Sequence, residues 1–193
     1  MHIKIIWTFL FSLFLFNPLM SQINPDWAVG YYGAYTYQPG IILKAEQLFE
    51  PIRVNKNKSM IKPYLGLELA SYFHFQNNAY INSSLSGGLQ RIGKKGRSFR
   101  LFASVGVLRA QNLIKSYRLN ESGQLEDLGR KGNWGFFPGL GIGLGGPSTR
   151  NRGKKIIPYA NFRLQMQTPY NDHFLLHPIF EIGTYFSSSK NRR

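Results

Sequence analysis

The chain has 193 residues, which is enough for one sizeable domain and marginal for two. Its 24 Lys and Arg residues against 9 Asp and Glu give a net charge of +15, and the absence of Cys excludes a disulfide framework and a lipid-modified N-terminal cysteine. Aromatic residues make up 15% of the chain and glycines number 20, and helix-period stretches are few, so the composition favours many strands over a helical bundle.

The first element is a short apolar segment behind a positive charge. Lys4 precedes an apolar run over 5–16, and Leu19-Met20-Ser21 suits cleavage. A run of about a dozen residues is short against the ~20 that a membrane-spanning helix needs, so we expect a secretory signal peptide instead of an anchor. The expected organisation is a signal peptide at 1–21, a folded domain at 22–187 and a basic C-terminal tail at 188–193.

Turn signals divide the remaining chain into eight expected strands. These are 27–37, 41–49, 62–75, 79–92, 98–119, 124–146, 156–167 and 174–187. Most of them exceed the ~5 to 6 residues usual in globular sheets and reach the ~9 to 11 that a strand tilted across a bilayer needs. Their length therefore favours a membrane barrel.

Alternate residues of these strands separate into an apolar face and a mixed face. In 62–75 the apolar face consists of Leu65, Leu67, Leu69, Phe73 and Phe75. A soluble sandwich or lipocalin would bury that face, but the mixed face here is rich in Gly and Ser and poor in charge, as a crowded lumen is. Aromatic residues also gather near strand ends, as in membrane girdles. We predict an all-β fold, namely a single eight-stranded antiparallel up-and-down transmembrane β-barrel.

Positive charge concentrates at one end of the predicted barrel. The turns at 50–61, 93–97 and 147–155 share that end with both termini, because turns alternate between two ends. Its basic patch consists of Lys94, Lys95, Arg97, Arg150, Arg152, Lys154 and Lys155. A barrel inserted after export normally leaves its termini in the periplasm, so this end would face anionic headgroups or other periplasmic polyanions; the alternative is solvated turn residues without a partner. Export and the placement of aromatics both oppose a nucleic-acid partner.

The mixed face also collects ionisable residues. They are Glu68, His74, Arg100, Arg163, His177 and Glu181. Buried charges in a small packed lumen need partners, so we expect a network of ion pairs and hydrogen bonds, with Arg163 facing Glu181 across adjacent strands. The alternative is a gate or narrow polar path, which needs a continuous wet lumen.

Catalytic and metal chemistry have weak support in the sequence. Ser71 lies on the lipid parity, whereas Glu68 and His74 lie on the lumen parity, so a triad from them would need a bulge to converge. Ser84 shares the lumen parity, but a lipid substrate would reach it poorly. His74 and His177 have no second ligand at metal-binding spacing, and we expect no catalytic residues, metal or cofactor.

Five short segments carry a likeness to known proteins. They are Met20-Ser21-Gln22, Gln38-Pro39-Gly40-Ile41, the glycine ladder 139–146, Gln167-Thr168-Pro169-Tyr170-Asn171 and Gly183-Thr184-Tyr185-Phe186. With these the chain resembles the small outer-membrane β-barrel proteins of Gram-negative bacteria, particularly those of the Bacteroidetes type. Barrels of that family usually end on an aromatic residue, whereas this chain continues to Arg193.

The resemblance implies a location in the cell outer membrane, contact with outer-membrane lipid, and the barrel-insertion machinery as a partner during assembly. The function expected is non-catalytic, with a structural or surface-interaction role, and the tip around Asn120-Glu121-Ser122-Gly123 is where we expect surface contacts. A lipid-modifying barrel enzyme, such as a lipid A acyl hydrolase or transferase, is the alternative, and an exported lipocalin-like binding protein is the third.

Overall fold

The computed structural model describes residues 25–35, 38–56, 58–74, 78–113, 116–120, 123–129, 132–147, 156–170 and 173–186. Within these ranges the regular structure is strand. No helix in this part of the chain is long and apolar enough to cross a membrane. The predicted signal peptide at 1–21 and tail at 188–193 lie outside the described residues.

In the described residues, twelve strands follow one another. They are β1 (Asp26–Ala34), β2 (Gly40–Leu48), β3 (Arg53–Val54), β4 (Met60–His74), β5 (Asn78–Ile92), β6 (Ser98–Asn112), β7 (Ser116–Leu119), β8 (Leu125–Gly129), β9 (Gly132–Phe136), β10 (Gly139–Gly145), β11 (Ile156–Tyr170) and β12 (His173–Phe186). Most carry the period-two alternation of a sheet with two different faces.

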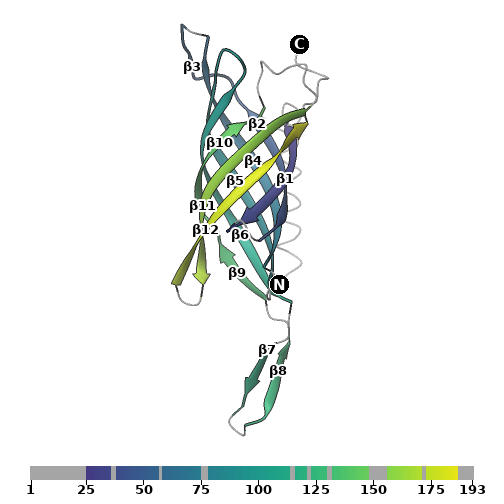
Figure 1. Ribbon diagram of the computed structural model, residues 1–193. Coiled ribbons are helices and arrows are strands. Elements are labelled where there is room, and N and C mark those ends of the chain that lie inside the picture. The colour runs from purple at the N-terminus through teal and green to yellow at the C-terminus, as the bar shows by residue number, and fades with distance from the viewer. Residues whose placement is uncertain are drawn as a thin grey trace, which may run out of the picture.

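The strands close into an antiparallel barrel of eight wall positions (Figure 1). The order around the wall is β1, β2, β4, β5, β6, then β9 with β10, then β11 and β12, and β12 pairs with β1 to complete the ring. β9 and β10 occupy one position because both pair with β6 and with β11. Pro138 lies in the break between them, since proline has no N–H to contribute to the ladder. The predicted eight-stranded barrel is confirmed.

Two of the expected strands extend too far. The expected strand 98–119 ends as β6 at Asn112, and the expected strand 124–146 begins in the wall only at Gly132. Between them β7 and β8 pair with each other and form a separate hairpin that projects beyond one end of the barrel (Figure 1). At the opposite end the short β3 pairs with the start of β4.

The two faces of the wall carry opposite chemistry, as the alternation predicted. Leu67 is 62% exposed and Leu140 69% exposed on the outside, whereas Glu68 is 4% exposed on the inside. The exterior is covered with Leu, Ile, Val and Phe, and the interior holds charged, amide and aromatic side chains. A lipocalin-like binder needs the reverse arrangement, so that alternative is excluded.

Aromatic side chains mark both ends of the apolar exterior. Trp27 and Phe186 are exposed near one end, and Trp134 and Phe174 are exposed near the other. The twelve steps from Phe174 to Phe186 along β12 span roughly 40 Å at ~3.3 Å per residue, or about 30 Å in height at a tilt of about 40°. This height fits the ~25 Å apolar band with flanking aromatic girdles of a transmembrane barrel.

Candidate functional site: charged clusters in the lumen

Four charged side chains from four wall strands meet near the middle of the lumen. Lys44 Nζ lies 3.2 Å from Glu68 Oε1 and 2.6 Å from Glu181 Oε2. Arg163 Nη1 lies 2.6 Å from Glu68 Oε2, and its Nη2 pairs with Glu181. Each side chain is at most 2% exposed. Two cations and two anions therefore form a neutral central cluster.

Neighbouring side chains donate hydrogen bonds to both carboxylates of the central cluster and place aromatic rings against its two cations. Ser84 Oγ donates to Glu68 Oε2 at 3.2 Å, and Asn161 Nδ2 donates to Glu181 Oε2 at 2.9 Å. The Tyr159 ring lies 5.1 Å from Lys44 Nζ, and the Phe102 ring lies 5.1 Å from the Arg163 guanidinium. Aromatic faces attract such cations, and hydrogen bonds to buried carboxylates reduce the cost of their burial.

A second ion pair lies toward the end of the barrel that carries β3. Arg100 holds Glu46 with two bonds, Nη2 to Oε2 at 2.6 Å and Nη1 to Oε1 at 3.2 Å. Arg100 also donates to Gln90 Oε1 from Nε at 3.3 Å, and to the Tyr185 hydroxyl at 2.9 Å. The Tyr64 ring lies 4.5 Å from the guanidinium. Arg100 is thus held on several sides, as a buried guanidinium requires.

Aromatic side chains fill the lumen toward the opposite end. The buried cluster there includes Tyr32, Tyr72, Tyr80, Leu108, Phe137 and Ile179. The Tyr72 and Tyr80 rings stack with centroids 4.7 Å apart, and the Tyr32 hydroxyl donates to Gln165 Oε1 at 2.7 Å. His177 also lies here, with Nε2 3.0 Å from Gln167 Oε1 and its ring edge-on to Phe137.

The structure separates the residues that the sequence placed in one network. Glu68, Arg163 and Glu181 come together, although Arg163 pairs in register with Ile179, so its contact with Glu181 is diagonal. Arg100 belongs to the second ion pair, and His177 belongs to the aromatic end. The side chain of His74 lies outside the described residues.

Sequence reasoning missed Lys44 and Glu46, which supply a cation to the central cluster and the anion of the second pair. The signal was present in β2, where Ile42, Lys44, Glu46 and Leu48 share one parity and are all buried.

Of the predicted basic patch, Lys94, Lys95 and Arg97 are exposed in the turn between β5 and β6. Arg150, Arg152, Lys154 and Lys155 lie outside the described residues.

The pairing of Ser83 with Glu68, one of the combinations open to a catalytic triad, is split between the two faces of the wall. Glu68 is engaged by Lys44, Arg163 and Ser84 inside the wall, whereas Ser83 is exposed on the outside. A serine on one face and an acid on the other cannot form one triad. Among the described residues, no group of three or more His, Asp or Glu side chains is placed to hold a metal ion.

A closed barrel with an apolar exterior, aromatic girdles and a polar interior defines a transmembrane β-barrel of the outer-membrane type, and its place is an outer membrane. No family model and no curated protein matches the chain. Solved structures similar to it include Neisserial surface protein A, with 10% identity and a TM-score of 0.49 over 84% of this chain and 93% of that one.

Two further solved structures are similar to most of the chain. The outer-membrane enzyme PagL has 12% identity and a TM-score of 0.45, over 84% of this chain and 97% of that one. The N-terminal β-barrel domain of Pseudomonas aeruginosa OprF has 13% identity and a TM-score of 0.43, over 85% of this chain and 98% of that one.

Proposed function

We propose that the protein is a non-catalytic outer-membrane barrel whose lumen is sealed and whose role is to hold the β7–β8 hairpin at the cell surface. The observation that carries the proposal is the central cluster, in which Lys44, Glu68, Arg163 and Glu181 reach across the lumen from β2, β4, β11 and β12 with at most 2% exposure. Side chains so placed occupy the space that an ion path would need.

The second ion pair and the aromatic end add further barriers to permeation. An ion crossing the lumen would have to displace the Arg100–Glu46 pair, the central cluster and the stacked Tyr72 and Tyr80 rings in turn. Each of these is buried, and separating a buried ion pair is costly. A structural or surface role fits such an interior better than transport.

Ion conductance tests the sealed lumen. We expect the purified barrel in a planar lipid bilayer to give no current steps above the lipid baseline. The control combines Lys44→Ala, Glu68→Ala, Arg163→Ala and Glu181→Ala with Glu46→Ala, Arg100→Ala, Tyr72→Ala and Tyr80→Ala. It removes all three barriers while keeping the lumen neutral, and it shows that a barrel of this size can be detected when open. Steady conductance by the unaltered protein would overturn the proposal.

In the proposed orientation the hairpin lies outside the cell, and the basic turn of Lys94, Lys95 and Arg97 lies in the periplasm. Two observations support it. Outer-membrane barrels carry long extracellular loops, and the hairpin is the long projecting element. The other end of the barrel holds Asp26 and Phe186, the first residue of the first strand and the last residue of the last strand. Export rests on residues 1–21 as a signal peptide, which predicts a mature N-terminus at Gln22 in protein sequencing.

Cysteine labelling tests the orientation cleanly because the chain has no Cys. Leu125 is 72% exposed on the hairpin, and Lys95 is exposed in the opposite turn. We expect a membrane-impermeant maleimide to label Leu125→Cys on intact cells and Lys95→Cys only after lysis. The opposite labelling pattern would invert the orientation.

Lipid A analysis tests the non-catalytic assignment. Mass spectrometry of lipid A from cells with and without the gene should give the same acyl pattern. A missing or transferred acyl chain that depends on the gene would establish the lipid-modifying enzyme instead.

The Bacteroidetes-type assignment belongs to the same proposal and rests on the short segments at 20–22, 38–41, 139–146, 167–171 and 183–186.

A further inference from the structure

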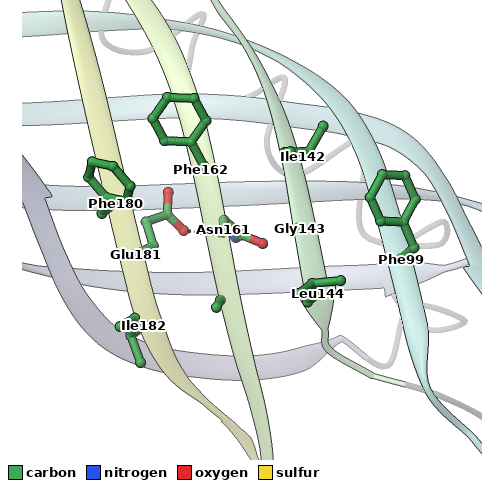
Figure 2. Close-up of a pocket in the computed structure, with 10 residues that line it drawn as sticks. Phe99, Ile142, Gly143, Leu144, Asn161, Phe162, Phe180, Glu181 and Ile182 are labelled. Carbon is green, nitrogen blue, oxygen red and sulfur yellow. Dashed lines mark hydrogen bonds between the residues drawn. The ribbon is translucent and has the colours of Figure 1, made fainter.

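A depression of about 320 Å³ interrupts the apolar exterior between β6, β10, β11 and β12 (Figure 2). Its large apolar lining residues are Phe99, Ile142, Leu144, Phe162, Phe180 and Ile182, and Asn161 and Glu181 of the lumen face also border it. The depression lies on the outer face of the wall, so hydrocarbon and not water surrounds it.

The depression exists because one small side chain stands among large ones. Ala160 faces outward on β11 and pairs in register with Leu144 on one side and Ile182 on the other. The next outward residue along β11 is Phe162, whose ring lies 4.9 Å from that of Phe180. The atoms that line an empty apolar space lack dispersion contacts on that side, and an apolar chain that fills the space supplies them. The depression, called the groove below, thus suits one acyl chain.

Basic side chains lie immediately beyond one end of this groove. Arg91 pairs in register with Phe99 across β5 and β6 and is exposed on the same outer face. The adjoining turn carries exposed Lys94, Lys95 and Arg97 and is closed by a hydrogen bond from Gly93 N–H to the Arg97 carbonyl at 2.8 Å. Positive charge at the membrane surface therefore adjoins an apolar groove that reaches into the membrane.

We propose that the groove and the basic turn together bind one phospholipid with an anionic headgroup. An acyl chain fills the groove over Ala160, and the headgroup phosphate lies against Arg91 and the turn residues Lys94, Lys95 and Arg97. This inference rests on the proposed membrane embedding of the barrel. Charge complementarity favours this occupant over a second copy of the chain, which would bring the same positive end against this one.

Native mass spectrometry of the detergent-purified barrel tests the site with two probes, phosphatidylglycerol and phosphatidylcholine with identical acyl chains. We expect the protein to retain phosphatidylglycerol preferentially. Replacing Arg91, Lys94, Lys95 and Arg97 with Gln should lower that preference by about fivefold for each charge that contacts the headgroup. Arg109→Gln is the matched control, because Arg109 is exposed on the outer face near the other end of β6, where it stacks on Trp134.

The acyl half of the site has its own matched pair of variants. Ala160→Leu fills the groove and should reduce retention of both lipids at least tenfold, whereas Ala103→Leu makes the same change on the outer face of β6 away from the groove and should leave both unchanged. Both positions face lipid, so neither substitution disturbs the lumen.

Several results would overturn the inference. Equal retention of the two lipids would remove the headgroup site, and unchanged retention by Ala160→Leu would remove the acyl site. Dimers that Ala160→Leu abolishes would make a second copy the occupant. A chain that fails to float with vesicles would refute membrane embedding itself, whereas flotation without lipid preference would refute only the lipid site.

Discussion

Glu68→Gln is the sharpest single perturbation of the lumen. Glu68 accepts from Arg163 at 2.6 and 3.2 Å and lies 3.2 Å from Lys44, with a side chain that is 2% exposed. Glutamine keeps the shape of the side chain and removes its charge. Lys44 and Arg163 are then left with Glu181 as the only carboxylate of the central cluster, and one positive charge remains uncompensated in the wall interior.

The expected cost follows from the burial of the cluster. Removing one partner of a buried pair costs about 3–5 kcal/mol, because the other charge stays buried without compensation. Glu68 pairs with two cations, so the free energy of unfolding of the variant should fall by about 4 kcal/mol, which is roughly a thousandfold in the unfolding equilibrium.

Urea unfolding in lipid vesicles measures the effect. Trp27 and Trp134 face outward, so their fluorescence reports the loss of the lipid environment. Glu126→Gln removes an exposed carboxylate from the hairpin and should change stability by less than ~0.5 kcal/mol. The double variant Glu68→Gln with Lys44→Met restores equal numbers of cations and anions and should recover about 2 kcal/mol.

Two outcomes would refute this reasoning about the cluster. The first is a Glu68→Gln barrel as stable as the unaltered protein within the error of the measurement. The second is a double variant whose loss of unfolding free energy equals or exceeds the summed losses of Glu68→Gln and Lys44→Met measured separately. Additive losses would show that Lys44 and Glu68 do not interact.

Three further predictions follow from the wall. Leu67→Arg and Leu140→Arg each place a charge on the lipid face and should cost roughly 2–4 kcal/mol, seen as a smaller heat-modifiable fraction after refolding into vesicles. Gly145→Ala should destabilise more than Gly123→Ala in the same urea assay, because both glycines have positive φ but only at Gly145 would the new Cβ collide with the β11 backbone. Replacing 114–131 with a short Asn-Gly turn should leave heat-modifiable migration intact, because β7 and β8 pair only with each other; a barrel that no longer folds would show that the hairpin supports the wall.

The faces of the strands could be predicted because side-chain direction alternates with a period of two. That alternation placed Glu68, Arg163 and Glu181 on one face of the sheet, and all three are buried. Their meeting could not be derived so directly, since Glu68 and Arg163 are 95 positions apart and come together only across the closed lumen. Lys44 was missed for a local reason: after Gly40, β2 continues with Ile41, Ile42 and Leu43, so its two faces look alike at the start.

The limits of the wall strands could not be predicted from the same pattern. β6 leaves the wall at Asn112, whose partner Asn78 is the first residue of β5. A strand continues in a sheet only while a neighbour supplies hydrogen bonds, whatever its own propensity. The residues after Asn112 still favour strand and therefore pair locally, as β7 with β8.

The glycine ladder of β10 links the wall to the central cluster. Gly141 and Gly143 lack the Cβ atoms that would collide with the Phe102 ring and the Asn161 side chain. Phe102 covers the Arg163 guanidinium, and Asn161 donates to Glu181, so both occupy room that the glycines leave open. The glycines are therefore a condition for a charged lumen and not merely for a thin wall. Enlarging either glycine should consequently weaken the ion pairs of Arg163 and Glu181 before it disturbs the apolar exterior.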